Sequence, residues 1–228
     1  MMLSKVGLVT NKPRNGALGG RENMFLSRIE LDTTRDETMR AISSPQILHA
    51  IIEGCFNEKN RTLWRLDSLH GRLFLLVVSE IVPCFKNLAT QLCKIGETGQ
   101  TKDYNAFLAN IKNGQQLRYR LRGNTVRSLA PGNDKRGKVV PCSNEISKRQ
   151  WLINKAASNG FTLDKHSFVM AETGQMRFFR NRNPVDISYS TFEGVLTVED
   201  AGLFVRALTN GVGRAKAYGC GLMTVMVM

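Results

Sequence analysis

The chain has 228 residues, room for one large domain or two of roughly 100 residues each, and its 42% hydrophobic content excludes a disordered polypeptide. Thirty-two Lys and Arg against 19 Asp and Glu give a net charge of +13, which predicts a polyanionic partner such as nucleic acid unless the excess is only scattered surface lysine. No stretch approaches the roughly 20 apolar residues of a membrane span and no signal-peptide pattern opens the chain, so we expect a cytoplasmic protein without membrane contact.

The first half of the chain begins with an irregular segment and continues as strands and helices. Residues 1–23 contain several Gly, Pro and Asn residues, and we expect a flexible N-terminal extension outside the core. Apolar spacing then predicts a strand at 24–31, a helix at 43–56 and a two-stranded hairpin at 62–78. A helix at 85–95, a loop at 96–105 and a strand at 115–124 follow. This is the element order of a ferredoxin-like fold, so we expect an N-terminal domain over 24–124.

A similar set of elements follows and predicts a C-terminal domain over 125–228. We expect a helix at 143–160, strands at 165–172, 175–182 and 187–199, a helix at 201–210 and a last strand at 221–228. Asp200 stands where it can cap the last helix. Two halves that each combine a sheet with helices indicate an α+β protein.

Three arginines, Arg118, Arg120 and Arg122, alternate along the strand predicted at 115–124, so their side chains share one face. A basic loop follows, with the cations Arg127, Lys135, Arg136 and Lys138. A charged strand face can serve solubility alone, but no acidic residue alternates opposite these arginines. We therefore favour a nucleic-acid contact for the strand and the loop.

The stretch NGVGRAKAYGCGLM at 210–223 carries four glycines and two basic residues. A dinucleotide-binding loop needs GxGxxG between a strand and a helix, whereas these glycines follow a helix and the third one stands late. We therefore expect no cofactor. Gly211 and Gly213 can bring backbone close to a phosphate beside Arg214 and Lys216, or the glycines can merely avoid clashes between the last helix and strand. Residue types leave these two interpretations equal.

His49 lies in the first turns of the helix that Ser44 can cap and Pro45 can open, where backbone N–H groups favour an anion. It stands beside the apolar stripe of that helix and can point into a groove, although a lone histidine is more often a surface or core-edge residue. We expect His70 and His166 to be structural or solvated. The five cysteines and three histidines show no zinc-ligand spacing, so we expect no metal.

Taken together and in order, six stretches of this sequence resemble the CasE family, the repeat-cleaving endoribonucleases of type I-E CRISPR systems. They are MFLSRIEL at 24–31, LHA at 48–50, LWRL at 63–66, GQQLRYRLRGN at 114–124, FEGVLTV at 192–198 and GVGRAKAYGCGLMTV at 211–225. The last is similar to the glycine-rich signature of the wider repeat-processing superfamily. The resemblance implies two tandem ferredoxin-like, RRM-related domains.

The same resemblance implies a function. An RNA stem-loop would bind across a basic face, and the pre-crRNA would be cut on the 3′ side of the repeat stem without a metal, by 2′-OH attack that leaves a 2′,3′-cyclic phosphate. The crRNA hairpin would stay bound as part of the Cascade complex, beside the backbone and 5′-handle-binding subunits, with target DNA contacted only through the complex. The family's histidine falls on His49, in a general acid–base role worth ~10²–10⁴-fold.

One residue departs from the family pattern. Members carry a tyrosine three residues before the histidine, where this sequence has Gln46. An amide can hydrogen-bond RNA but cannot act as a phenolic acid. Either Gln46 only positions the RNA, or another group assists, with Lys216 a candidate for stabilising charge on the phosphate. The alternative function is a non-catalytic subunit that binds the crRNA hairpin. In both cases we expect the glycine stretch to close the second domain and to lay Arg214 and Lys216 against RNA.

Overall fold

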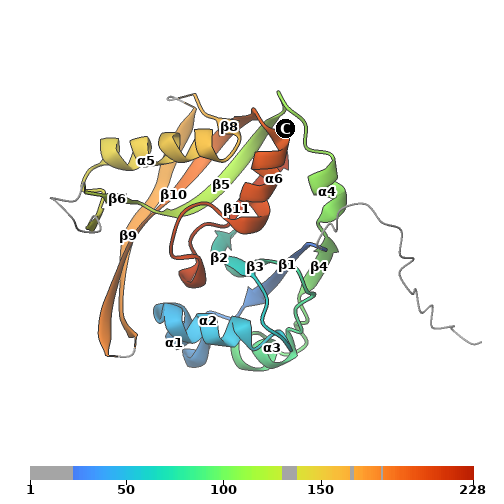
Figure 1. Cartoon of the computed structure of the whole chain (residues 1–228). Helices are drawn as coiled ribbons and strands as arrows, with labels where there is room; N and C mark the ends of the chain where they lie inside the picture. The colour runs from blue at the N-terminus through green and yellow to red at the C-terminus, as the bar shows by residue number, and fades with distance from the viewer. Residues whose placement is uncertain (1–22, 130–137, 165–166, 181) are drawn as a thin grey trace, which may run out of the picture.

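The computed structural model describes residues 23–129, 138–164, 167–180 and 182–228 and shows two α+β units joined face to face (Figure 1). An antiparallel four-stranded sheet in the order β2-β3-β1-β4 forms the N-terminal unit. Its strands are β1 (Phe25–Leu31), β2 (Thr62–Leu69), β3 (Arg72–Ser79) and β4 (Gln100–Asp103). Its helices are α1 (Asp36–Ser43), α2 (Pro45–Glu53) and α3 (Lys86–Leu92), and the short α4 (Asn105–Ala109) follows β4. This strand order is that of a ferredoxin-like fold.

The C-terminal unit repeats the same order, β11-β5-β10-β8, with β9 paired along β10. Its strands are β5 (Gln116–Asn124), β8 (Phe161–Thr162), β9 (Phe168–Arg180), β10 (Asn183–Val198) and β11 (Met223–Val227). Helices α5 (Glu145–Ser158) and α6 (Ala201–Asn210) cover one face, and β6 (Val126–Ser128) pairs with β7 (Val139–Pro141) in a separate hairpin. The prediction of two tandem ferredoxin-like folds is confirmed.

Two sequence expectations need correction. The segment 96–105, expected as a loop, contains β4, which pairs with β1 from Phe25 opposite Asp103 to Arg28 opposite Gln100. All four residues of β4 are exposed, so the segment has no apolar alternation that could have marked it as a strand. The strand β5 was expected to complete the first unit, but it pairs with β10 and β11 and opens the second one. It therefore lies outside the N-terminal unit that was expected to reach residue 124.

The second unit differs from expectation in its longest hairpin. The strands expected separately at 165–172 and 175–182 are one strand, β9, and β10 runs antiparallel to it over most of its length. The far end of the β9–β10 hairpin projects beyond the sheet and lies beside α1 and α2 of the first unit (Figure 1). This reach brings the C-terminal unit to the helices of the N-terminal one.

Two apolar clusters form the core, and the larger one spans both units. Ile29, Leu48 and Leu75 lie in a cluster between the first sheet and its helices. A larger cluster fills the second unit and also includes Leu63 and Val78 from the first sheet. Burying a side chain of this size contributes about 1.5–3 kcal/mol, so these shared residues hold the units together as one body. The expected flexible extension at 1–23 lies outside the described residues, except for residue 23.

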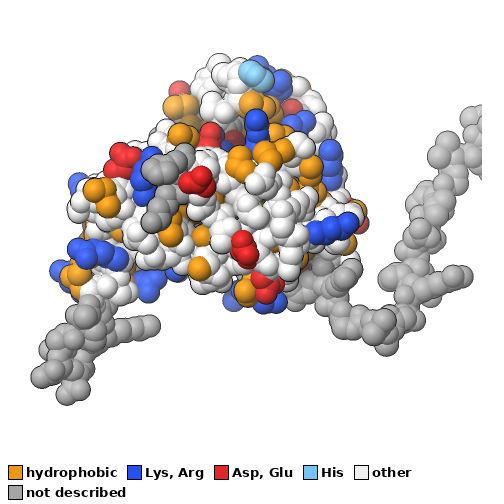
Figure 2. All heavy atoms as spheres, turned by 90° about the horizontal axis from the view of Figure 1, so that it is seen from above, with side chains coloured by type: hydrophobic (Ala, Val, Ile, Leu, Met, Phe, Trp, Pro, Cys, Tyr) orange, Lys and Arg blue, Asp and Glu red, His pale blue; other side chains and the backbone are white. Residues whose placement is uncertain are grey.

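Charged side chains are not spread evenly over the surface. On the face seen from above Figure 1, basic side chains lie toward the margins with acidic ones between them (Figure 2). The described side chains on this face form no continuous basic patch, so cations on other faces are considered as sites for a polyanion. Within the described ranges, no helix has the length and apolar character that crossing a membrane requires.

Candidate functional site

His49 sits at the edge of α2, on the side that turns toward the second unit. Leu48 and Ile52 are buried and anchor the helix, while the side chain of His49 keeps 29% of its exposure. Its Nε2 atom lies 3.5 Å from Oε1 of Glu53, one helical turn later, so that carboxylate can orient the ring and stabilise it when protonated. Pro45 occupies the first turn as expected, but the side chain of the preceding Ser44 makes no capping hydrogen bond.

An aromatic pair of the second unit reaches His49 through Tyr218. The ring centroid of Tyr218 lies 6.1 Å from that of His49, with the planes at 65° in an edge contact. Phe178 of β9 lies 4.7 Å from Tyr218. Helix α2, the glycine-rich loop and the β9–β10 hairpin therefore converge on one histidine. Tyr218 was missed from the sequence, because nothing in the loop marks its tyrosine as close to a helix of the other unit.

The glycines of the loop at 211–221 are required by packing. Gly219 has φ +77, and a Cβ built on it would lie 2.8 Å from the ring of Trp64 in β2. Gly211 has φ +74, and its Cβ would lie 2.7 Å from the side chain of Leu63. A Cβ on Gly213 would meet the Trp151 ring at 3.0 Å. Gly211 and Gly219 thus let the loop lie directly on the first unit, while Gly213 packs against α5. Backbone contact of Gly211 and Gly213 with RNA stays a prediction.

Lys216 has a structural partner within the loop. Its Nζ atom donates a hydrogen bond of 2.5 Å to the backbone carbonyl of Asn210, at the C-terminus of α6. Burial, and secondarily the charge of Arg61, lowers the pKa of this lysine. The ammonium group therefore ties the loop to the end of α6, where a helix favours a cation. Its expected role at a scissile phosphate stays a prediction.

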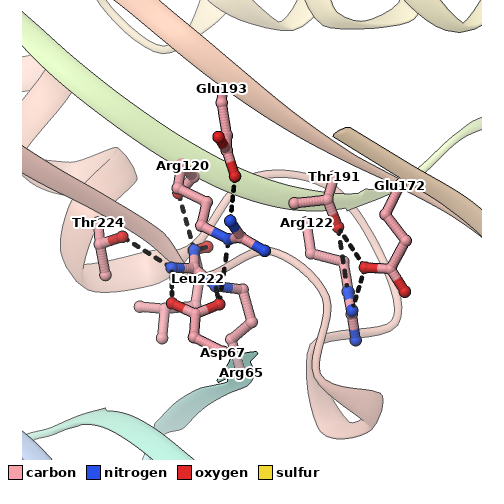
Figure 3. A network of polar contacts seen from close by, with 9 residues as sticks. All are labelled: Arg65, Asp67, Arg120, Arg122, Glu172, Thr191, Glu193, Leu222 and Thr224. Atoms are coloured by element: carbon pink, nitrogen blue, oxygen red, sulfur yellow. Dashed lines mark hydrogen bonds and ion pairs between the residues drawn. The ribbon is translucent and has the colours of Figure 1, made fainter. Parts of the chain in front are cut away.

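The arginines of β5 are not equivalent. Arg118 is exposed and has no ion pair within the described part of the chain. Arg120 forms ion pairs with Glu193, directly across on β10, and with Asp67, whose Oδ1 is 3.2 Å from its Nε (Figure 3). Arg122 contacts Glu172 at 2.6 Å. The sequence argument that no acidic residue opposes these arginines is therefore wrong, because their carboxylate partners come from distant segments.

A buried arginine joins the two units (Figure 3). Arg65 of β2 is 1% exposed, and its Nε and Nη2 donate to both carboxylate oxygens of Asp67 at 2.7 and 2.6 Å. Its Nη1 donates to the backbone carbonyls of Arg120 and Leu222 at 2.7 and 2.8 Å, and Nη2 also donates to the Thr224 hydroxyl at 2.7 Å. A single guanidinium thus fixes β2 to β5 and β11. The only sequence signal was a charged residue inside the apolar run LWRL.

Three unpaired cations line a hollow of about 400 Å³ at the start of the glycine-rich loop. They are Arg127 of β6, Lys155 of α5 and Arg214, and none has an ion pair among the described residues. The hollow has no carboxylate in its lining and has Trp151 in its wall. Such a site favours an anion. Of the other expected cations, Lys138 is exposed immediately before β7, and Lys135 and Arg136 lie outside the described residues, as does His166.

The remaining expectations concern small ligands and metals. Among residues 23–129, 138–164, 167–180 and 182–228, no group of three or more His, Cys, Asp or Glu side chains is placed to hold a metal ion. Gln46 is exposed on α2, one helical turn before His49. The structure thus brings His49 and the loop of Lys216 together and places Arg118 and the cationic hollow on the second unit.

The chain is similar to known proteins over most of its length. The family described as CRISPR associated protein matches residues 24–226. The CRISPR-associated endoribonuclease Cse3 of Thermus thermophilus is 26% identical over 219 residues, which are 89% of this chain and 99% of that protein. The Cascade subunit CasE of Escherichia coli K12 is 32% identical over 120 residues, 49% of this chain and 58% of that protein. A solved structure of Thermus thermophilus Cse3 with an RNA representing a pre-cleavage complex has a TM-score of 0.76 at 25% identity, over 90% of this chain and 99% of that one.

Proposed function

The chain belongs to the family of CRISPR-associated proteins, and from this premise we propose that it is an endoribonuclease that cleaves CRISPR repeat RNA and keeps the hairpin product within a Cascade complex. The observation that carries the proposal is the position of His49, where α2, the glycine-rich loop and the β9–β10 hairpin meet. A partly exposed histidine whose Nε2 lies 3.5 Å from the Glu53 carboxylate suits proton transfer at a phosphodiester.

The reaction needs few groups. His49 takes the proton from the 2′-OH upstream of the scissile bond, the O2′–P bond forms as the P–O5′ bond breaks, and a 2′,3′-cyclic phosphate results. The 5′-oxygen takes a proton from water, and the imidazolium returns its proton to the solvent. The nucleophile and the leaving group both belong to the RNA and the protein only moves a proton, so we propose that cleavage needs no metal ion.

In this proposal, cations on the second unit bind the phosphate backbone of the RNA. Arg118 and the hollow of Arg127, Lys155 and Arg214 offer charges that no carboxylate neutralises within the described ranges. The outer part of the β9–β10 hairpin adds the exposed Arg180. A-form RNA is recognised largely through its backbone and shape, so several dispersed cations fit a stem better than one reading helix. We propose that the stem crosses these cations and places its 3′ base at His49.

RNA that copurifies with the protein tests this proposal. The protein would be produced with a transcript of several repeats from its own CRISPR locus, and the ends of the bound RNA would be sequenced. We expect one hairpin per protein with a uniform 3′ end at the base of the stem. Uncut transcript bound by the wild-type protein would favour the alternative, a non-catalytic hairpin-binding subunit of the complex. Absence of any repeat RNA would contradict both.

A further inference from the structure

The ring of Tyr218 lies against the histidine of the other unit. The edge contact with His49, with centroids 6.1 Å apart, crosses the junction between the two units. Phe178 contacts the same tyrosine ring at 4.7 Å, tilted by 58°. Because both neighbours are rings of limited freedom, the direction of the Tyr218 hydroxyl is set by packing.

Tyr218 combines partial exposure with a hydroxyl that has no partner within the described ranges, a combination that the other three tyrosines lack. Tyr104 and Tyr119 are buried in the core. Tyr189 donates a hydrogen bond of 3.0 Å to Glu172. Tyr218 is half-buried, and no partner for its hydroxyl is found among the described residues. It is therefore the phenol that remains available to a molecule bound at His49.

The other polar groups near His49 are less suited to stabilise charge. Gln46 is an exposed amide at the start of α2. The ammonium group of Lys216 is bonded to the Asn210 carbonyl at 2.5 Å. A phenol donates a strong hydrogen bond without being charged, and it does so best from a fixed position. Tyr218 has that fixed position.

The turn that carries Tyr218 has a strained backbone. The 3-10 turn Lys216–Tyr218 is bracketed by two left-handed residues, Ala215 at φ +60 and Gly219 at φ +77. Alanine rarely adopts a positive φ, and strained non-glycine residues gather at functional sites. The glycine that ends this turn also leaves no room for a Cβ, which would lie 2.8 Å from the Trp64 ring.

We infer that Tyr218 is a catalytic residue, whose hydroxyl donates a hydrogen bond to a non-bridging oxygen of the phosphate that the 2′-oxygen attacks when His49 removes its proton. This inference rests on the proposed function and adds a residue to it. The phenol keeps its proton throughout. It stabilises the negative charge that grows on the phosphorus-bound oxygens while the O2′–P bond forms and the P–O5′ bond breaks. Tyr218, which belongs to the second unit, thus provides a phenol near His49, whereas position 46 on α2 carries the amide of Gln46.

The test is Tyr218→Phe, which keeps the ring and its contacts and removes only the hydroxyl. Single-turnover cleavage would be measured at saturating protein, and affinity would be measured with a repeat RNA carrying a 2′-deoxy nucleotide at the cleavage site. Loss of one preorganised donor lowers such rates by ~10²–10³-fold, so we expect a fall of about 10²-fold with the Kd and Tm unchanged. Tyr104→Phe, which removes a core hydroxyl, serves as the control and leaves the rate unchanged.

Each of the other outcomes would overturn the assignment of Tyr218 as a catalytic residue. Cleavage by Tyr218→Phe at the wild-type rate overturns the inference and leaves the proposed function standing. A lower rate that arises only from weaker binding or a lower Tm also overturns it, because the tyrosine would then be structural. Absence of cleavage by the wild-type protein overturns the proposed function and this inference with it.

Discussion

Replacing Arg65 by methionine should weaken the junction between the two units more than any other single charge deletion. The guanidinium of this buried side chain donates two hydrogen bonds to Asp67 and three to Arg120, Leu222 and Thr224. Removing one partner of a buried ion pair costs about 3–5 kcal/mol, because the other partner stays buried without compensation. Arg120 remains 3.2 Å from Asp67 and still neutralises part of its charge, so we expect the lower end of this range, about 3 kcal/mol.

The assay is urea denaturation followed by tryptophan fluorescence. The chain has two tryptophans, and they lie in different units: Trp64 in β2 and Trp151 in α5. Variants that keep one tryptophan each report the unfolding of each unit. We expect both probes to report the same midpoint in the wild-type background and separate midpoints once Arg65→Met has loosened the junction.

The matched control is Arg72→Met. Arg72 also pairs with a glutamate, Glu30, but its side chain is 61% exposed. Exposed ion pairs add little to stability, so this variant should leave both midpoints nearly unchanged. A loss of less than about 1 kcal/mol for Arg65→Met, or an equal loss for Arg72→Met, would refute the reasoning that burial and complete hydrogen bonding make Arg65 the joint between the units.

Two further predictions concern the glycine-rich loop and the grip on RNA. Gly219→Ala should destabilise the protein by about 1–3 kcal/mol, because its Cβ would meet the Trp64 ring at 2.8 Å and its φ is +77; an unchanged urea midpoint would contradict the packing account. Alanine at Arg118, Lys155 or Arg214 should weaken binding to the repeat hairpin and lower the slope of log Kd against log salt by ~0.7–0.9 each, without changing the single-turnover rate at saturation. A wild-type slope in all three variants would move the RNA away from these cations.

The sequence predicted the elements better than their pairing. Apolar periodicity located β1, α2, the β2–β3 hairpin and β5, because each of them buries one face in a core. Strand β4 escaped detection, since QTKD has no buried side chain and is held by backbone pairing and polar side-chain contacts with β1, which leave no apolar pattern in the sequence. The assignment of β5 to the first unit failed for a related reason: alternation shows that a strand has a buried face, but not which sheet it joins.

The candidate site could be predicted only where a short motif carried it. His49 was singled out by its place on a helix and by the family resemblance, whereas Tyr218 and Phe178 reach it only through tertiary folding. The carboxylate of Glu193 that neutralises Arg120 also comes from a distant strand, so a count of local charges overstated the basic face. Residue spacing along the chain does not encode contacts between segments this far apart.

The most direct test of the central claim is cleavage of the cognate repeat RNA in EDTA by the wild-type protein and by His49→Ala. We expect the wild-type protein to cut once at the 3′ base of the stem and to leave a 2′,3′-cyclic phosphate. We expect His49→Ala to bind the same RNA with unchanged affinity and to cleave at least ~10²-fold more slowly. A requirement for a divalent metal, or cleavage by His49→Ala at the wild-type rate, would contradict the account.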